Sequence, residues 1–581
     1  MKSQKLFSLI LTLCVLLQLT GCVTGKKVIY TGTDFDPLID QMFLDEVKND
    51  SVTLNYTLAR PENYGIKEFT PTLGSYSQKN MKRGHKAAKQ YIKKLEQFDY
   101  DTLSTEQKKN YDIILKYLKE QAHSDKLNLY NEVLSPTTGL QAQLPVLLAE
   151  FHFLDKKDIE NYISCLNQMK DYYSQIIAFE KEKSKAGLFM SDTSANAIIS
   201  QCKDFIKNPE ENFLITLFNH RMDSYTALSE TEKQTYKQQN KEAVLQSVIP
   251  AYQLLIKELT NLKGTGKNNG GLCHFKHGKE YYKYLVKTNT GSDRPIKAID
   301  TLLDETISDC LKNIGVIISA DPDMQTKLDQ YYYPLTDPEE ILSYLQRAIE
   351  VDFPKLKEVN CMVKTVDKSL EEHISPAFYL TPQLDNCKNN CIYINKSKKY
   401  DLSQIFPTIA HEGYPGHLYQ NCYYSQKNAK PIRYLLNFDG YSEGWATYVE
   451  MYSYSIAGLD DAVAKVLAYN QIATLCIYAK CDININYYGW DLNTTTSYLK
   501  TFGFTDKNIS KQIHESMIEE PCNYLKYTLG YLELTALKKK AKEKLGDKFS
   551  ALAFHQFVLD MGPCQFKVLE KYMDKWIKEQ I

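Results

Sequence analysis

Apolar and polar residues follow each other along this chain mainly with the spacing of α-helices. In several long segments, apolar side chains recur every three or four residues between charged ones, which is the pattern of a helix with one buried face. The predicted helices of this kind cover residues 76–98, 104–122, 155–185 and 229–262. Two helix starts are also marked, because Ser229 and Glu232 form a capping box and Asp337 precedes Pro338 at a first helical position. The sequence shows no repeat of fixed period, which excludes a solenoid.

One region has the alternation expected of β-strands. It consists of three short segments, residues 361–366, 377–381 and 391–395. They predict a small antiparallel sheet that leads into a helix beginning near Ser403. Two roles stay open for this sheet: an edge strand can pair with an extended peptide, or the sheet only supports the helix that follows.

A segment rich in glycine and asparagine, residues 263–271, predicts a flexible, solvated loop. Its glycine spacing fits neither nucleotide-binding fingerprint, and no strand precedes it. A chain of 581 residues usually forms two or more domains. We therefore expect this loop to separate an N-terminal helical part, residues 36–270, from a catalytic part, residues 271–581.

The N-terminus has the features of an export signal. Lys2 and Lys5 precede an apolar run at residues 6–17 that is too short to span a bilayer. The next residues, Leu19-Thr20-Gly21-Cys22, resemble the bacterial lipobox, in which cleavage before the cysteine leaves its thiol to be lipidated. This predicts a signal peptide at 1–21, a lipid anchor on Cys22, a tether over 22–35 and a position on the extracytoplasmic face of the membrane. The alternative is an ordinary signal peptide followed by an incidental cysteine.

Composition narrows the possible partners. The formal net charge is −1, which argues against binding of nucleic acid. Among the 14 cysteines there is no Cys-x-x-Cys pair, so a cysteine zinc site is not expected. An exported chain can form disulfides, and Cys387 and Cys391 flank a turn-like triplet that a disulfide could bridge.

Candidate chemistry is concentrated in the stretch His411-Glu412-Gly413-Tyr414-Pro415-Gly416-His417. On an ideal helix, two histidines six residues apart lie about 9 Å apart along the axis and point about 120° away from each other. Such imidazoles cannot share a zinc ion, whose bonds to nitrogen are about 2.0–2.1 Å long. Proline and glycine between them supply the means to distort the helix. We expect a bulge that absorbs two residues and brings both imidazoles to one point.

A second predicted helix, which carries Glu443 and Glu450, completes the candidate site. His411 and His417 are the proposed nitrogen ligands of zinc and Glu443 is the third ligand. Glu412 adjoins a ligand in sequence and is therefore assigned as the general base that activates a zinc-bound water. Glu450 lies two turns after Glu443 on the same face, so it either orients a ligating histidine or replaces Glu443.

These motifs resemble those of a large bacterial family of unknown function that carries an HEGxPGH motif and is grouped with the gluzincin-like zinc metallopeptidases. The similarity extends beyond residues 411–417 to most of the chain, and it is strongest from Gly278 onward. The further similar segments are residues 278–282, 375–379, 393–395, 443–450, 521–530 and 545–555. One departure is Pro521-Cys522-Asn523, where relatives often have Pro-Gly-Gln, and it leaves open which tyrosine faces the cleft.

The resemblance implies a mainly α, metallopeptidase-like fold with a deep cleft and a small sheet at its wall. It implies zinc held by the two histidines and Glu443, with Glu412 catalytic. It also implies that Tyr524, Tyr527 or His555 donates to the oxyanion of the reaction, a contribution typically worth about 3–4 kcal/mol.

The expected function is zinc-dependent hydrolysis of amide bonds in short peptides outside the cell, by a lipid-anchored oligopeptidase or carboxypeptidase-like enzyme. The first alternative is a zinc amidohydrolase that acts on a non-peptide. The second is a surface lipoprotein that binds peptides without cutting them.

Overall fold

The computed structural model describes residues 29–581, except 367, 369–370 and 372–374. The predicted signal peptide and the anchor at Cys22 lie outside the described residues. The first helix, α1 (Gly32–Val47), begins inside the predicted tether, because Thr31 and Asp34 form a capping box there. Phe35 is already fully buried, so the folded body begins before residue 36.

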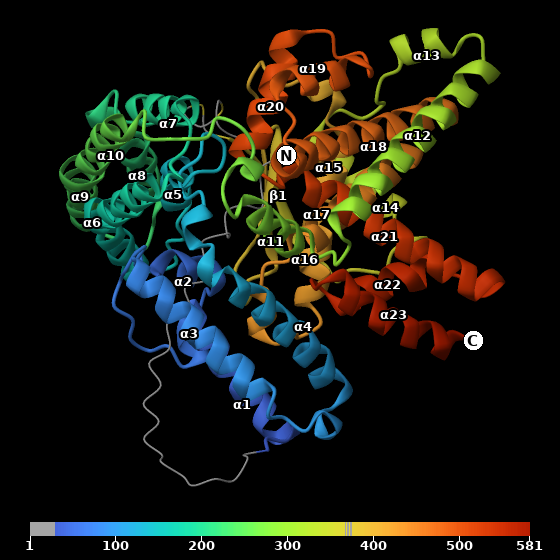
Figure 1. The fold of residues 1–581 in the computed structure, drawn as a ribbon. Helices are drawn as coiled ribbons and strands as arrows, with labels where there is room; N and C mark the ends of the chain where they lie inside the picture. The colour runs from blue at the N-terminus through green and yellow to red at the C-terminus, as the bar shows by residue number, and fades with distance from the viewer. Residues whose placement is uncertain (1–28, 367, 369–370, 372–374) are drawn as a thin grey trace.

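The first half of the chain is helical throughout. Its helices are α1, α2 (Ser51–Thr57), α3 (Gln78–Leu95), α4 (Thr105–Gln121), α5 (Leu140–Ala149), α6 (Lys156–Ala186), α7 (Asp192–Phe205), α8 (Phe213–Ser224), α9 (Glu230–Ala243) and α10 (Ile249–Leu262). The helices predicted from periodicity are confirmed to within a few residues, and the capping box at Ser229 is present. A π-helical turn, Val244–Val248, joins α9 to α10 within the segment predicted as one helix. Figure 1 shows α5 to α10 gathered on one side of the molecule.

The second half contains the remaining helices and the sheet. The helices are α11 (Gly278–Thr290), α12 (Ile296–Ala320), α13 (Met324–Gln330), α14 (Pro338–Ala348), α15 (Phe406–Glu412), α16 (His417–Ser425), α17 (Asp439–Ser453), α18 (Asp461–Ile483), α19 (Leu492–Lys500), α20 (Lys507–Glu519), α21 (Asn523–Leu545), α22 (Ala551–Met561) and α23 (Phe566–Gln580). The span Asp461–Tyr488 is long and apolar enough to cross a membrane, but half of its apolar window is buried inside the protein. Since α18 packs against α12 and α21, we interpret it as a core helix.

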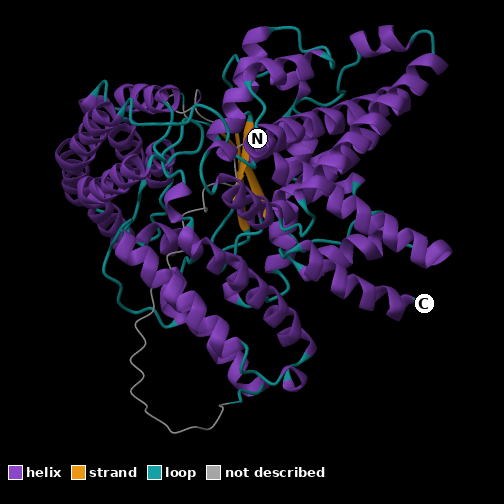
Figure 2. Ribbon diagram, in the orientation of Figure 1, coloured by secondary structure: helices purple, strands orange, loops and turns teal. Residues whose placement is uncertain are grey.

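The sheet is mixed, which corrects the prediction that it is antiparallel. Its strands are β1 (Asn360–Thr365), β2 (Ala377–Leu380) and β3 (Asn389–Ile394), and their order in space is β1-β3-β2. Strand β3 lies between the other two, parallel to β1 and antiparallel to β2. Because β2 carries the chain back between them, β1 and β3 run in the same direction and must pair in parallel. Figure 2 shows these strands among helices near the centre of the molecule.

Two large apolar cores fill the described part of the chain. One joins residues from α1 to Tyr130 with residues from Leu272 to Ile577, and the other spans Val52 to Leu259. The cores therefore cross the boundary predicted at residue 270. The predicted linker is packed at two of its glycines, since a Cβ on Gly266 would lie 2.4 Å from the Met190 carbonyl oxygen and one on Gly271 would lie 2.2 Å from that of Ile485. Other residues of the segment, such as Lys263 and Gly264, are exposed.

The cysteines of the described residues are free thiols, and most of them are buried. This includes Cys387 and Cys391, for which a disulfide across a turn was considered. The thiol of Cys387 instead donates to the carbonyl oxygens of Gln383 and Leu384, while Cys391 pairs within the sheet.

Helices α17 and α21 cross at glycine residues, and this crossing sets the position of the predicted ligand Glu443. A Cβ on Gly444 would lie 2.4 Å from the carbonyl carbon of Gly530, and one on Gly530 would lie 2.1 Å from the carbonyl oxygen of Gly440. Side chains at these positions would force the backbones apart. The absence of a Cβ therefore allows α21 to lie directly against the helix that carries Glu443.

This close approach gives a stability prediction. We expect Gly444→Ala to lower the free energy of unfolding by about 2–3 kcal/mol, since overpacking a tight contact costs about 1–3 kcal/mol or more. The control is Gly315→Ala in α12, where a Cβ would meet nothing within 4 Å. It should raise stability by about 0.5–1 kcal/mol, the usual helical advantage of alanine over glycine. Urea unfolding measures both, and equal effects of the two substitutions would contradict the packing argument.

Candidate metal centre

The two histidines of the motif belong to different helices. α15 ends at Glu412 and α16 begins at His417, so the chain stops one helix and starts another where a bulge within a single helix was expected. Gly416 makes this possible because it lies on the end of α15, where a Cβ would be 1.8 Å from the carbonyl oxygen of His411. The indole Nε1 of Trp445, on α17, donates to the carbonyl oxygen of Pro415 at 2.9 Å and holds the connection in place.

The break brings the predicted ligand atoms together. The ring centroids of His411 and His417 are 4.8 Å apart, with the rings nearly perpendicular. Oε2 of Glu443 lies 3.7 Å from Nε2 of His411 and 3.5 Å from Nε2 of His417. One ligand atom from each of the three residues lies within 4.8 Å of the other two, and all three residues are buried. The structure thus assembles a His-His-Glu cluster that could hold a metal ion. We refer to this candidate site as the metal centre.

Glu450 occupies the position of an orienting residue. Its Oε2 lies 2.9 Å from Nδ1 of His411, and its Oε1 accepts a hydrogen bond from Gln471 at 3.3 Å. This contact leaves Nε2 of His411 facing Glu443. Burial alone would lower the pKa of His411, but the neighbouring carboxylates of Glu443 and Glu450 raise it to about 10. The two carboxylates therefore favour positive charge at this point.

Glu412 is held beside the metal centre by the sheet. Its Oε2 accepts a hydrogen bond at 2.9 Å from the backbone N–H of Tyr379, in the edge strand β2, and its side chain is 2% exposed. The edge of β2 thus uses one of its donors to orient the predicted base. This contact was not foreseen from the sequence, which left the role of the sheet open.

Helix α21 adds two side chains to the metal centre. The side chain of Tyr527 lies beside Glu443. Burial, and next the charge of this carboxylate, raise the pKa of Tyr527 well above its usual range. Nζ of the buried Lys526 lies 3.6 Å from Oε1 of Glu443. Although burial would raise it, Lys526 and the two histidines hold the pKa of Glu443 well below its usual range, so this group is a carboxylate. Sequence reasoning missed Lys526, whose one signal was a lysine inside an apolar run of α21.

The other two predicted oxyanion donors lie among different neighbours. Tyr524 packs edge-on against Tyr478, with ring centroids 5.2 Å apart. Both ring nitrogens of His555 have partners, the Tyr448 hydroxyl at 2.7 Å and the Asp352 carbonyl oxygen at 2.6 Å. Of the three candidates, the structure brings Tyr527 to the metal centre.

The residues of the metal centre fit a zinc ion. Tetrahedral ligands with bonds of about 2.0–2.1 Å lie roughly 3.3 Å from one another, close to the separations of Glu443 from the two histidines. Two imidazoles and a carboxylate leave the fourth position to water, as catalytic zinc sites do. A carboxylate bonded to the far nitrogen of a ligating histidine, as Glu450 is here, is the usual orienting partner.

Comparison with known proteins shows the fold and the family. A protein from Colwellia psychrerythraea, whose crystal structure is described as that of a "putative lipoprotein", superposes with a TM-score of 0.83 at 20% sequence identity, covering 95% of this chain and 100% of that chain. A protein from Shewanella oneidensis, described as a "putative lipoprotein of unknown function", superposes with a TM-score of 0.61 at 13% identity, covering 92% and 98%. At these identities the similarity shows a shared fold.

No curated protein matches the chain. The sequence pattern of the family described as "Bacterial protein of unknown function (DUF885)" matches residues 62–573, and the chain therefore belongs to this family.

Proposed function

We propose that this protein is a zinc-dependent peptidase that hydrolyses amide bonds in short peptides. The observation that carries the proposal is the convergence of His411, His417 and Glu443 on one point, with Glu412 buried and oriented beside it. Zinc bound there would lower the pKa of its water to roughly 7. Three buried carboxylates around two imidazoles also form a site that favours a cation over an empty state.

In the proposed reaction, protein side chains transfer the proton, stabilise the oxyanion and orient a ligand. Glu412 receives the proton of the attacking water on a carboxylate oxygen and passes it to the leaving amine. The Tyr527 hydroxyl stays protonated because its pKa is raised, so it can donate to the oxyanion that forms on the substrate. Glu450 acts on His411 and holds its ring in the ligating orientation.

We further propose that the enzyme is anchored by lipid on the outer face of the membrane. The lipobox-like residues Leu19-Thr20-Gly21-Cys22 support this, and so do the two proteins of the same fold that are described as lipoproteins. Substrates would then be peptides that reach the extracytoplasmic surface.

Replacing the base separates hydrolysis from metal binding. We expect Glu412→Gln to lower peptide hydrolysis by about 10²–10⁴-fold, the usual contribution of a positioned acid–base group, while about one zinc per chain is retained. A mixture of peptides followed by mass spectrometry measures hydrolysis, and elemental analysis measures zinc.

The control for this experiment is Glu305→Gln, on the exposed surface of α12, which should leave both quantities unchanged. Hydrolysis that survives in Glu412→Gln would remove Glu412 from its role. Stoichiometric zinc without turnover of any peptide by the unmodified protein would favour the non-peptide substrate, and absence of zinc would favour the peptide-binding lipoprotein.

The roles of the two glutamates of α17 are separable by zinc affinity. We expect Glu450→Gln to weaken zinc binding by about 10–100-fold, the usual effect of losing an orienting carboxylate, and Glu443→Gln to weaken it further because a ligand is lost. Competition with a chromogenic chelator measures both dissociation constants. If Glu450→Gln weakens binding as much as Glu443→Gln, then Glu450 is itself a ligand.

A further inference from the structure

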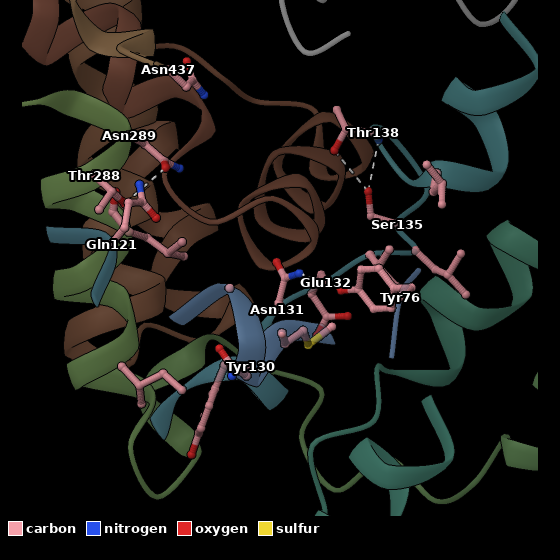
Figure 3. A pocket seen from close by; sticks show the side chains of 18 of the residues that line it. Tyr76, Gln121, Tyr130, Asn131, Glu132, Ser135, Thr138, Thr288, Asn289 and Asn437 are labelled. Carbon is pink, nitrogen blue, oxygen red and sulfur yellow. Dashed lines mark hydrogen bonds between the residues drawn. The ribbon is translucent and has the colours of Figure 1, made fainter. Parts of the chain in front are cut away.

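A large cavity lies between the N-terminal helices and the elements that carry the metal centre. Its volume is about 970 Å³, and its walls come from α1, α3, α4, residues 127–140, α11, the start of α17 and the end of α20. Figure 3 shows Gln121, Thr288 and Asn289 on one side and Tyr76, Ser135 and Thr138 on the other. None of the site residues predicted from the sequence is among those that line this cavity, and no sequence pattern indicated it.

The cavity extends to within one helical turn of the metal centre. Asp439 lines the cavity and lies four residues before Glu443 on α17, which is about 6 Å along the helix axis. The buried ammonium of Lys526 interacts electrostatically with Asp439, Glu443 and Glu520, so it lies between the cavity wall and the metal centre. Lys526 thus couples the carboxylates of the cavity wall electrostatically to Glu443.

The lining of the cavity is acidic. Seven carboxylates line it, against two strongly basic side chains, Lys48 and Arg83. The seven are Asp45, Glu46, Asp50, Glu132, Asp439, Glu519 and Glu520. Several of them have protein partners: Asp50 caps α2 through Thr53, Glu132 forms an ion pair with the buried Lys183, and Asp45 accepts hydrogen bonds from Gln41 and Tyr91.

Glu46 is the carboxylate that points to a ligand. It lines the cavity and is only 7% exposed, and its Oε2 makes no hydrogen bond of good geometry in the described part of the chain, although the side chain of Asn49 lies near enough to lower its pKa. A buried carboxylate oxygen without a partner is costly, and a bound donor would satisfy it. Glu46 and Asp439 both act electrostatically on Tyr117, which also lines the cavity.

The remaining lining suits a peptide that carries an amine. Side-chain amides of Asn131, Asn289 and Asn437 can hydrogen-bond with peptide groups. Tyrosine rings, among them Tyr76 and Tyr130, can pack against a cation. A cavity of this volume is within the usual range for small-molecule sites of about 300–1,000 Å³, so it holds a short segment rather than a folded protein.

We infer that this cavity binds the substrate through a positively charged amine, with Glu46 as its main partner, so that the preferred substrates are short peptides with a lysine side chain or a free amino terminus. This inference rests on the proposed function in one respect, namely that the ligand is a peptide. The positive charge of the ligand is inferred from the excess of carboxylates in the lining and from the buried Oε2 of Glu46.

The test measures binding in the zinc-loaded Glu412→Gln protein, where turnover is not required. The probes are hexapeptides of one sequence, acetylated and amidated, that carry lysine, norleucine or glutamate at one position. A fourth probe has a free amino terminus and norleucine. Calorimetry should show that the lysine or the free-amine probe binds at least about tenfold more tightly than the acetylated norleucine probe, and that the glutamate probe binds most weakly.

Glu46→Gln, added to the same background, should abolish most of this preference. Burial and the nearby Asp50 raise the pKa of Glu46 to about 8 in the free protein, and a bound ammonium group would favour the ionised form. Glutamine has the shape of the protonated side chain, so the fold should persist. The matched control is Glu242→Gln on the exposed surface of α9, which should keep the preference. Circular dichroism of each variant verifies that it is folded.

Equal affinities for all four probes would overturn the inference, and so would a preference that Glu46→Gln leaves intact. A charge preference that depends on Glu46, in a protein whose unmodified form cuts none of the probes, would support the cavity assignment and count against the proposed hydrolysis. The two proposals therefore fail by different measurements.

Discussion

The contact of Gly416 with the carbonyl oxygen of His411 is the constraint on which the candidate site depends. It allows the chain to end α15 and begin α16 within four residues, which turns the second imidazole toward the first. The indole of Trp445 fastens this connection to α17, the helix that carries Glu443. One tight turn thus sets the relative positions of all three proposed ligands.

The buried charges around the two imidazoles also support the proposed metal site. Glu412, Glu443 and Glu450 are buried around two imidazoles, and the cationic side chain paired with Glu443 is Lys526. Burying carboxylates is costly unless a positive charge compensates for them. A divalent cation would supply that charge at the point where the ligand atoms converge. The lining of the neighbouring cavity also has more carboxylates than strongly basic side chains, and the proposed preference for positively charged peptides rests on this excess.

Local patterns in the sequence predicted much of the fold, but contacts between distant segments limited the rest. Long helices such as α3 and α6 were predictable because their apolar spacing and their caps are local. The order of the strands was not predictable, because three short segments can pair in several ways. The return of the chain through β2 decides which strands are neighbours. The boundary at 270 follows a glycine-rich composition, whereas the core joins α1 and α4 to the C-terminal helices.

In the candidate site, too, local patterns were predictable and contacts between distant segments were not. The histidines and Glu443 were found because ligand chemistry limits residue type and spacing. Lys526 and the Tyr379 amide belong to elements far apart in the chain. The amide has no local signal, and a lysine inside an apolar run does not by itself indicate which residue it pairs with. The most direct measurement of the central claim is the zinc-edge X-ray absorption spectrum of the zinc-loaded protein. The account predicts one zinc with two imidazole nitrogens and carboxylate and water oxygens at about 2.0–2.1 Å. A spectrum without imidazole scattering, or zinc that is lost on dialysis, would contradict it.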